Sequence, residues 1–229
     1  MYYSDNNGNE IVIPELTTDI IGLSMSGGAD SSLLAYLFAK KIIDDKSKTV
    51  IQPFTRRRPF PQPNPKDWNV AKSKIIVQKI VELLGANVFL PHYVEEQPNG
   101  QNDLQTYDQE QNHLEDLHKK LEKLANGTFV YYYGVTANPS IEEMIKHDFL
   151  TDERIKDRDV RTIKRDTRPF DLVDKKFIAE IYAKENLLDS LFPLTYSCER
   201  FFDDTDGFTK HCGECWWCKE RYWAFGRLV

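Results

Sequence analysis

Apolar residues recur along the chain with two alternating spacings, one typical of buried strands and one typical of helices. Short apolar or β-branched runs predict core strands over residues 19–25, 49–54, 86–90 and 128–134. Apolar positions three or four residues apart predict helices over residues 29–43, 67–84, Leu114 to Leu124, and 171–190. A briefer alternation predicts a strand within residues 10–16. This order favours an α/β fold, with a Rossmann-like parallel sheet and helices on both faces.

Three polar segments interrupt the pattern. Four prolines between Pro59 and Pro65 are incompatible with a helix or a strand ladder and predict a loop. Residues 97–112 predict a loop or an irregular helix. Residues 151–168 hold seven Lys or Arg against five Asp or Glu, which predicts a solvated segment and a candidate lid.

Length and charge narrow the class of protein. The 229 residues suffice for one ample core plus a small appendage, which we place at residues 1–190 and 191–229. The net charge of −6 argues against a chain that coats nucleic acid, although a local basic patch keeps nucleic acid open as a partner. No apolar run approaches the roughly 20 residues of a membrane helix, and the polar N-terminus lacks a signal-peptide core. We therefore expect a cytoplasmic protein without a membrane partner.

A glycine turn follows the first predicted core strand. The run Ser26-Gly27-Gly28-Ala29-Asp30-Ser31-Ser32 comes directly after Ile20–Leu23 and opens the next helix. Glycines let a ligand approach the backbone, and a helix N-terminus offers unpaired N–H groups to phosphate. Ser31 and Ser32 add hydroxyls, and Asp30 is a candidate magnesium ligand. The Walker lysine pattern is absent. The carboxyl-end rule for parallel sheets places this turn, Thr55 and Gly134 around one crevice.

All four cysteines lie in the last 32 residues, as Cys212-x2-Cys215-x2-Cys218 with Cys198 upstream. Two-residue spacings let neighbouring thiolates converge on a tetrahedral ion, and a fourth thiolate closes the site, which is typical of structural Zn²⁺. An iron–sulfur cluster, or free or disulfide-bonded cysteines, are the alternatives. The adjacent His211 is either a substitute ligand or a loop residue.

Two motifs carry a resemblance to known enzymes. Ser26-Gly27-Gly28-x-Asp30-Ser31 resembles the PP-loop of the N-type ATP pyrophosphatases. Cys212-Gly213-Glu214-Cys215-x-x-Cys218-x-x-Arg221-x-x-Ala224-Phe225 resembles the zinc signature of the 7-cyano-7-deazaguanine synthase family of queuosine biosynthesis. Leu194-Thr195-Tyr196-Ser197-Cys198 is similar to that family's Leu-Thr-Trp-Ser-Cys segment. Arg168-Pro169-Phe170, followed by Lys175, resembles the segment whose lysine reaches the nucleotide phosphates.

The resemblance implies an ATP-dependent ligase and nitrile synthase using ATP, Mg²⁺ and Zn²⁺. Such an enzyme adenylates a carboxylate, 7-carboxy-7-deazaguanine or a related base, releases pyrophosphate, and aminates the product with ammonia. It implies catalytic roles for Asp30 and Lys175 within an ATP-binding domain over residues 1–190. The implied nucleotide-binding residues are Leu23, Ser24, Met25, Ser26, Gly27, Gly28, Asp30, Ser31, Ser32 and Gly134. A homodimer is a candidate assembly.

The chain also departs from that family. Phe54-Thr55-Arg56-Arg57-Arg58-Pro59 replaces a Tyr-Gly-Gln-Arg-His-type segment, and Pro139 stands where the family has an aspartate. The identity of the acceptor therefore stays open, and the alternatives are a different small molecule, tRNA or a protein. A non-catalytic ATP-binding module is the alternative to an enzyme. For Arg56, Arg57 and Arg58 we expect one of two roles: binding of an anion, or a solvated turn. For Trp216 and Trp217 the alternatives are stacking on a base and packing inside the protein. Tyr131–Tyr133 are expected in the core.

Overall fold

The computed structural model describes residues 1–57, 68–96, 115–123, 129–151, 167–200 and 203–229. The predicted proline loop at 59–65, the segment 97–112 and most of the candidate lid lie outside these ranges, as do Leu114 and Leu124. Among the described residues, no helix combines the length and the hydrophobicity that a membrane-spanning segment needs.

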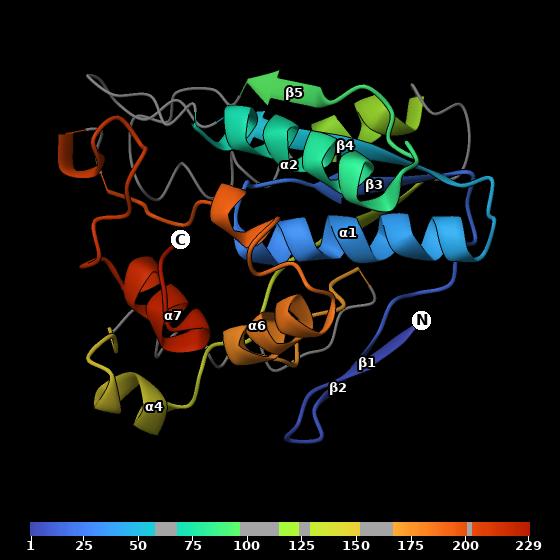
Figure 1. The fold of residues 1–229 in the computed structure, drawn as a ribbon. Helices are drawn as coiled ribbons and strands as arrows, with labels where there is room; N and C mark the ends of the chain where they lie inside the picture. Colours follow the sequence, from blue (N-terminus) through green and yellow to red (C-terminus); the bar gives the residue numbers. More distant parts are fainter. Residues whose placement is uncertain (58–67, 97–114, 124–128, 152–166, 201–202) are drawn as a thin grey trace.

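Four parallel strands form the central sheet. They are β3 (Ile20–Ser24), β4 (Val50–Arg57), β5 (Tyr93–Glu96) and β6 (Phe129–Tyr133), in the spatial order β5-β4-β3-β6. In register, Ser24 pairs with both Phe54 and Tyr133. The predicted parallel α/β fold is confirmed (Figure 1).

The third predicted strand is displaced along the chain. Residues 86–90 contribute only an isolated bridge between Phe89 and Ile51, and the ladder resumes at Tyr93. Pro91 lies between the two pairings and has no N–H to donate, which accounts for the interruption. The alternation within 10–16 gives β2 (Glu10–Val12), paired antiparallel with β1 (Tyr2–Ser4), which the sequence pattern did not predict.

The described helices cover the sheet or pack on one another (Figure 1). They are α1 (Ala29–Asp44), α2 (Trp68–Leu84), α4 (Ile141–Lys146), α6 (Lys175–Lys184) and α7 (Trp216–Phe225), with a further helical stretch at 115–123. Short 3-10 turns cover Phe192–Leu194 and Asp203–Thr205. Residues 171–190 form a shorter helix than predicted, α6. It begins only at Lys175, because the Asp174 carboxylate caps its start by accepting from the N–H groups of Lys176 and Phe177.

Alternation along β6 divides the core into two layers. Tyr132 packs against Phe38 of α1, with ring centroids 4.5 Å apart. Tyr131 and Tyr133 point to the other face and share a smaller apolar cluster with Leu117 of the 115–123 helix. Both faces are thus covered, and the three tyrosines belong to these layers as expected.

The strand order creates a switch point between β3 and β6. The chain passes from β3 through α1 to β4 on one side, whereas β6 lies on the other side of β3. Connections therefore diverge at the carboxyl ends of β3 and β6, where ligands bind in folds of this kind.

Candidate functional site

The glycine turn begins where β3 ends. The N–H of Met25 donates to the carbonyl of Phe54 over 2.8 Å. The carbonyl of Met25 accepts from the hydroxyls of Thr55, at 2.7 Å, and Ser73, at 3.1 Å. The start of the turn is consequently fixed to β4 and α2, both through buried hydroxyls.

The turn itself is shaped by its glycines and serines. Gly27 has a φ of 81°, a conformation that favours glycine, and Gly28 is the N-cap of α1. The hydroxyls of Ser31 and Ser32 donate to the carbonyl of Gly28 at 3.2 and 2.6 Å. The Ser31 hydroxyl also lies 3.0 Å from that of Ser26. These hydroxyls therefore fold the turn.

Gly134 follows β6 and lies against the start of α1. A Cβ at this position would come within 2.7 Å of the Asp30 carbonyl carbon and the Ser31 nitrogen. Only a residue without a side chain fits such a close approach to backbone atoms. The structure thus brings Gly134 to the glycine turn across the switch point.

Lys175, the first residue of α6, forms ion pairs with two carboxylates. Its Nζ lies 3.1 Å from Asp30 Oδ2 and 3.1 Å from Glu220 Oε2. Lys175 is 7% exposed and Glu220 2% exposed. The structure therefore joins the two sequence-predicted catalytic residues and adds Glu220, which sequence analysis missed.

Burial sets the electrostatics of this group. Loss of solvation raises the pKa of Asp30, opposed by the nearby charge of Lys175. Burial alone would discharge Lys175, but attraction to Asp30 and Glu220 outweighs it, so the pKa of Lys175 is raised. The second oxygen of Asp30, Oδ1, is buried and has no hydrogen-bond partner among the described residues. It is an acceptor suited to a cation or a donor group.

A cavity of about 300 Å³ opens beside the turn. Ser24, Met25, Ser26, Gly28, Asp30 and Lys175 line it, whereas Leu23, Gly27, Ser31, Ser32 and Gly134 lie outside its lining. Its remaining walls come from Ala29, Arg56, Trp68, Asn69, Tyr196, Ser197, Glu199 and Trp217. Trp68 and Asn69 were missed, although their place at the start of the helix after β4 was the available signal.

The C-terminal segment completes this site. The N–H of Tyr196 donates to the carbonyl of Gly27 over 2.8 Å. Tyr196 also packs against Trp68, with ring centroids 4.7 Å apart. Residues from the cysteine segment thus form one wall of the cavity beside the glycine turn.

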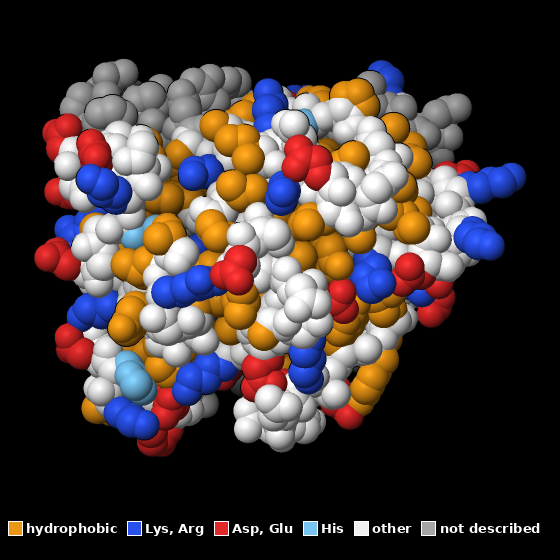
Figure 2. Space-filling model, in the orientation of Figure 1, with side chains coloured by type: hydrophobic (Ala, Val, Ile, Leu, Met, Phe, Trp, Pro, Cys, Tyr) orange, Lys and Arg blue, Asp and Glu red, His pale blue; other side chains and the backbone are white. Residues whose placement is uncertain are grey.

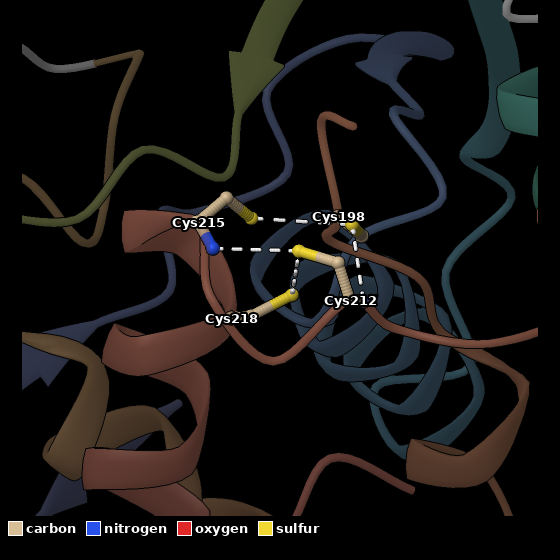
Figure 3. Close-up of side chains that lie close together, drawn as sticks. All are labelled: Cys198, Cys212, Cys215 and Cys218. Atoms are coloured by element: carbon tan, nitrogen blue, oxygen red, sulfur yellow. Dashed lines mark hydrogen bonds between the residues drawn. The ribbon is translucent and has the colours of Figure 1, made fainter. Parts of the chain in front are cut away.

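The four cysteines converge from two chain segments and turn their sulfurs toward one another (Figure 3). All four Sγ atoms lie within 4.8 Å of each other. The Cys212–Cys218 and Cys215–Cys198 pairs are each 3.9 Å apart. A tetrahedral Zn²⁺ with Zn–S bonds of about 2.3 Å requires sulfurs about 3.8 Å apart. The cluster therefore fits a zinc ion.

Backbone groups support the same assignment. The N–H groups of Glu214 and Cys215 approach Cys212 Sγ at 3.4 and 3.3 Å, and that of Cys212 approaches Cys198 Sγ at 3.5 Å. Such donors stabilise thiolates. His211 is not part of the cluster: its Nε2 accepts from the N–H of Ser197 over 3.3 Å, as expected of a loop residue.

Arg221 anchors the helix that carries Cys218. Its side chain is fully buried and donates to Ser197 Oγ, Thr195 Oγ1 and the carbonyl of Leu228 at 3.2, 2.8 and 2.7 Å. Its guanidinium stacks 3.9 Å above the Phe192 ring. This arginine of the predicted zinc motif therefore joins α7 to residues 192–197.

The other candidates divide between the site and the surface. Arg56 lines the cavity and has bonding partners, whereas Arg58 and residues 152–166 of the basic segment lie outside the described residues. Trp216 and Trp217 stack on each other at 4.0 Å, and Trp217 reaches the cavity. Acidic and basic side chains are interspersed over the face shown in Figure 2.

No protein-family model matches the chain, and no curated protein matches it significantly.

Proposed function

We propose that this protein is an ATP-dependent ligase of the PP-loop class, which adenylates a carboxylate and then aminates it. The single observation that carries the proposal is the cavity in which the glycine turn, Asp30 and Lys175 meet beyond the carboxyl end of β3. In that cavity the start of α1 and a charged lysine face the same space, and both attract phosphate.

Each residue has a defined task in this proposal. The backbone of Ser26 to Gly28 holds the nucleotide phosphates, and Lys175 opposes the charge of the departing pyrophosphate. Asp30, through Oδ1, would hold Mg²⁺. Magnesium, when bound, neutralises charge that develops on the phosphates. The four cysteines would hold Zn²⁺ as a closed structural site, because four thiolates leave no position for substrate.

The acceptor follows from the rest of the cavity. Trp68, Tyr196 and Trp217 give aromatic walls, and Arg56 provides a cation. A planar base that bears a carboxylate matches that combination. We propose 7-carboxy-7-deazaguanine or a related base. Its carboxylate would displace pyrophosphate from ATP, and ammonia would then displace AMP to give an amide. A second ATP-dependent round would dehydrate the amide to a nitrile.

The test is incubation of the protein with ATP, Mg²⁺, ammonium and 7-carboxy-7-deazaguanine, followed by mass spectrometry of nucleotides and bases. We expect AMP, pyrophosphate and an amide or nitrile base. Intact ATP in a folded, zinc-loaded sample would contradict this acceptor. A panel of other carboxylates, tRNA and protein then separates a different acceptor from a non-catalytic ATP-binding module, which binds ATP without cleaving it.

Asp30→Asn is the variant that tests the site. Removing its charge should lower Mg²⁺-dependent ATP cleavage about a hundredfold or more, as loss of a positioned electrostatic group does in other enzymes. Asp44→Asn is the matched control, because Asp44 lies on the same helix with its side chain 48% exposed and pairs with Lys40. Equal cleavage by both variants would remove Asp30 from the mechanism.

A further inference from the structure

Lys175 is held from two sides, and the two sides differ. Asp30 lines the cavity beside the glycine turn. Glu220 is absent from the lining and lies behind the lysine on α7, almost fully buried. Both carboxylates nevertheless reach Nζ at the same distance of 3.1 Å. One partner of Lys175 therefore faces the ligand space, and the other faces the protein interior.

We propose that Glu220 is a positioning residue for Lys175, through which the cysteine segment fixes the lysine of the phosphate site. The contact itself is independent of the reaction, and only its consequence for phosphate rests on the proposed function. Glu220 keeps the lysine in place when Asp30 turns toward a cation.

Charge balance supports a division of labour between the carboxylates. Two carboxylates share the single ammonium of Lys175, and like charges held close together repel. The group therefore has one carboxylate more than the lysine needs. The free oxygen of Asp30 lies on the carboxylate that lines the cavity, so Asp30 is the one that can release the lysine.

Two groups of contacts fix the position of Glu220 on α7: those of the cysteine cluster at the start of the helix, and those of the neighbouring Arg221. Cys215 is the N-cap of α7, and Cys218 lies in its first turn, so the cysteine cluster defines where the helix begins. Arg221, next in sequence, is bonded to Ser197 and Thr195 and fixes the rotation of the helix. A helix with a fixed start and rotation places Glu220 at one point.

A coupling between the cysteine cluster and the lysine follows. Disordering the first turn of α7 withdraws Glu220 from Lys175, and any ligand that orders Lys175 favours the ordered turn in return. In this proposal the cysteine cluster influences the cavity through the Glu220 side chain, which holds Lys175 in place.

The primary test reads Lys175 directly in the full chain, without nucleotide. Purified protein is treated with an amine-acylating reagent, and labelling at each lysine is followed by mass spectrometry. Glu220→Gln should accelerate labelling of Lys175 about tenfold, because a charge-assisted hydrogen bond of the lysine is lost. Lys176, which pairs with Glu143, is the internal reference and should not change.

Two further variants make the readout specific. Glu214→Gln removes an exposed carboxylate from the same cysteine segment and should leave Lys175 labelling unchanged. Glu220→Asp keeps the charge and should label more slowly than Glu220→Gln. Unchanged Lys175 labelling in zinc-loaded Glu220→Gln overturns the proposal. Accelerated labelling in a protein that binds no ATP would leave the proposal standing while removing the proposed function.

If Glu220→Gln fails to fold, the variants Lys175→Met, Glu220→Asp and Lys175→Met/Glu220→Asp give a double-mutant cycle in unfolding free energy. A direct pairing predicts that the Glu220 change costs less once the lysine is gone. Additive costs would overturn the proposal.

Discussion

A methyl group at Gly134 would lie 2.7 Å from the Asp30 carbonyl carbon and from the Ser31 nitrogen. Both are backbone atoms at the start of α1, so neither can rotate away. We expect Gly134→Ala to lower the free energy of unfolding by about 1–3 kcal/mol, as overpacking does elsewhere. The measurement is denaturant unfolding of both proteins.

Gly28→Ala is the matched comparison. Gly28 has a φ of −83°, and a Cβ there would meet its nearest neighbour, Ser26 Oγ, at an ordinary 3.4 Å. Its unfolding free energy should stay within about 1 kcal/mol of the original protein. A loss as large as that of Gly134→Ala would contradict the argument from close approach.

Single residues differ in how well sequence alone could identify them. Asp30 and the cysteines stand in short motifs, and Lys175 follows a recognisable segment. Glu220 could not be singled out, because its partner lies far away in sequence and the apolar pattern predicts no helix around it. Trp68 and Asn69 come directly after the proline-rich segment, where the sequence shows no periodic pattern. Only the rule that ligands bind at the carboxyl ends of parallel strands indicated that this region could line the site.

At the level of elements, Glu143 joins three helices. This residue of α4 accepts from Trp223 Nε1 of α7 at 2.7 Å and from Lys176 Nζ of α6 at 3.0 Å. The hydrogen bond from Trp223, then that from Lys176, lowers the pKa of Glu143 from 4.5 to about 2. A carboxyl group whose pKa is lower in the folded state stabilises the fold at pH values above its unfolded pKa. That stability is lost as the pH falls from about 4.5 toward 2.

Glu143→Gln should therefore be less stable than the original protein at pH 7, and the difference should shrink as pH falls from 5 to about 2. Urea unfolding at a series of pH values measures it. Glu82→Gln, which removes a carboxylate from an exposed i,i+3 pair on α2, should show no such trend. A Glu143→Gln deficit that is constant across pH would refute the assigned contacts.

Elements were predictable where the apolar pattern was long. The strands β3, β4 and β6 and the helices α1 and α2 lie within a few residues of their predicted bounds. The exceptions have local causes. Pro91 delays β5, and the turn before β2 is closed by Asp5, whose carboxylate accepts from the N–H groups of Asn7 and Asn9. Such side-chain-to-backbone bonds leave little trace in an apolar pattern.

For the whole molecule, the cysteine cluster should stabilise more than its own segment. We expect one zinc ion per chain, and its removal by a chelator should lower the Tm by about 10 °C or more. Because Tyr196 bonds to Gly27 and Glu220 pairs with Lys175 beside the glycine turn, hydrogen exchange should also accelerate at residues 24–32.

Two variants separate the metal from its surroundings. Cys218→Ala should lose zinc, because Cys218 lies within the cluster. His211→Ala should keep it, because His211 bonds instead to the Ser197 N–H. Unchanged exchange at residues 24–32 after complete zinc removal would show that the cluster acts only on its own segment.

The bond from Tyr196 to Gly27 also bears on how the protein is made. A ribosome delivers the glycine turn early and Tyr196 far later, with the cysteines and Glu220 later still. The nascent chain can pair β3 with β4 long before these groups emerge. The pocket beside the glycine turn would therefore take shape only after Tyr196 and the cysteines have emerged, so a translation product truncated before them would carry the signature loop without a finished site.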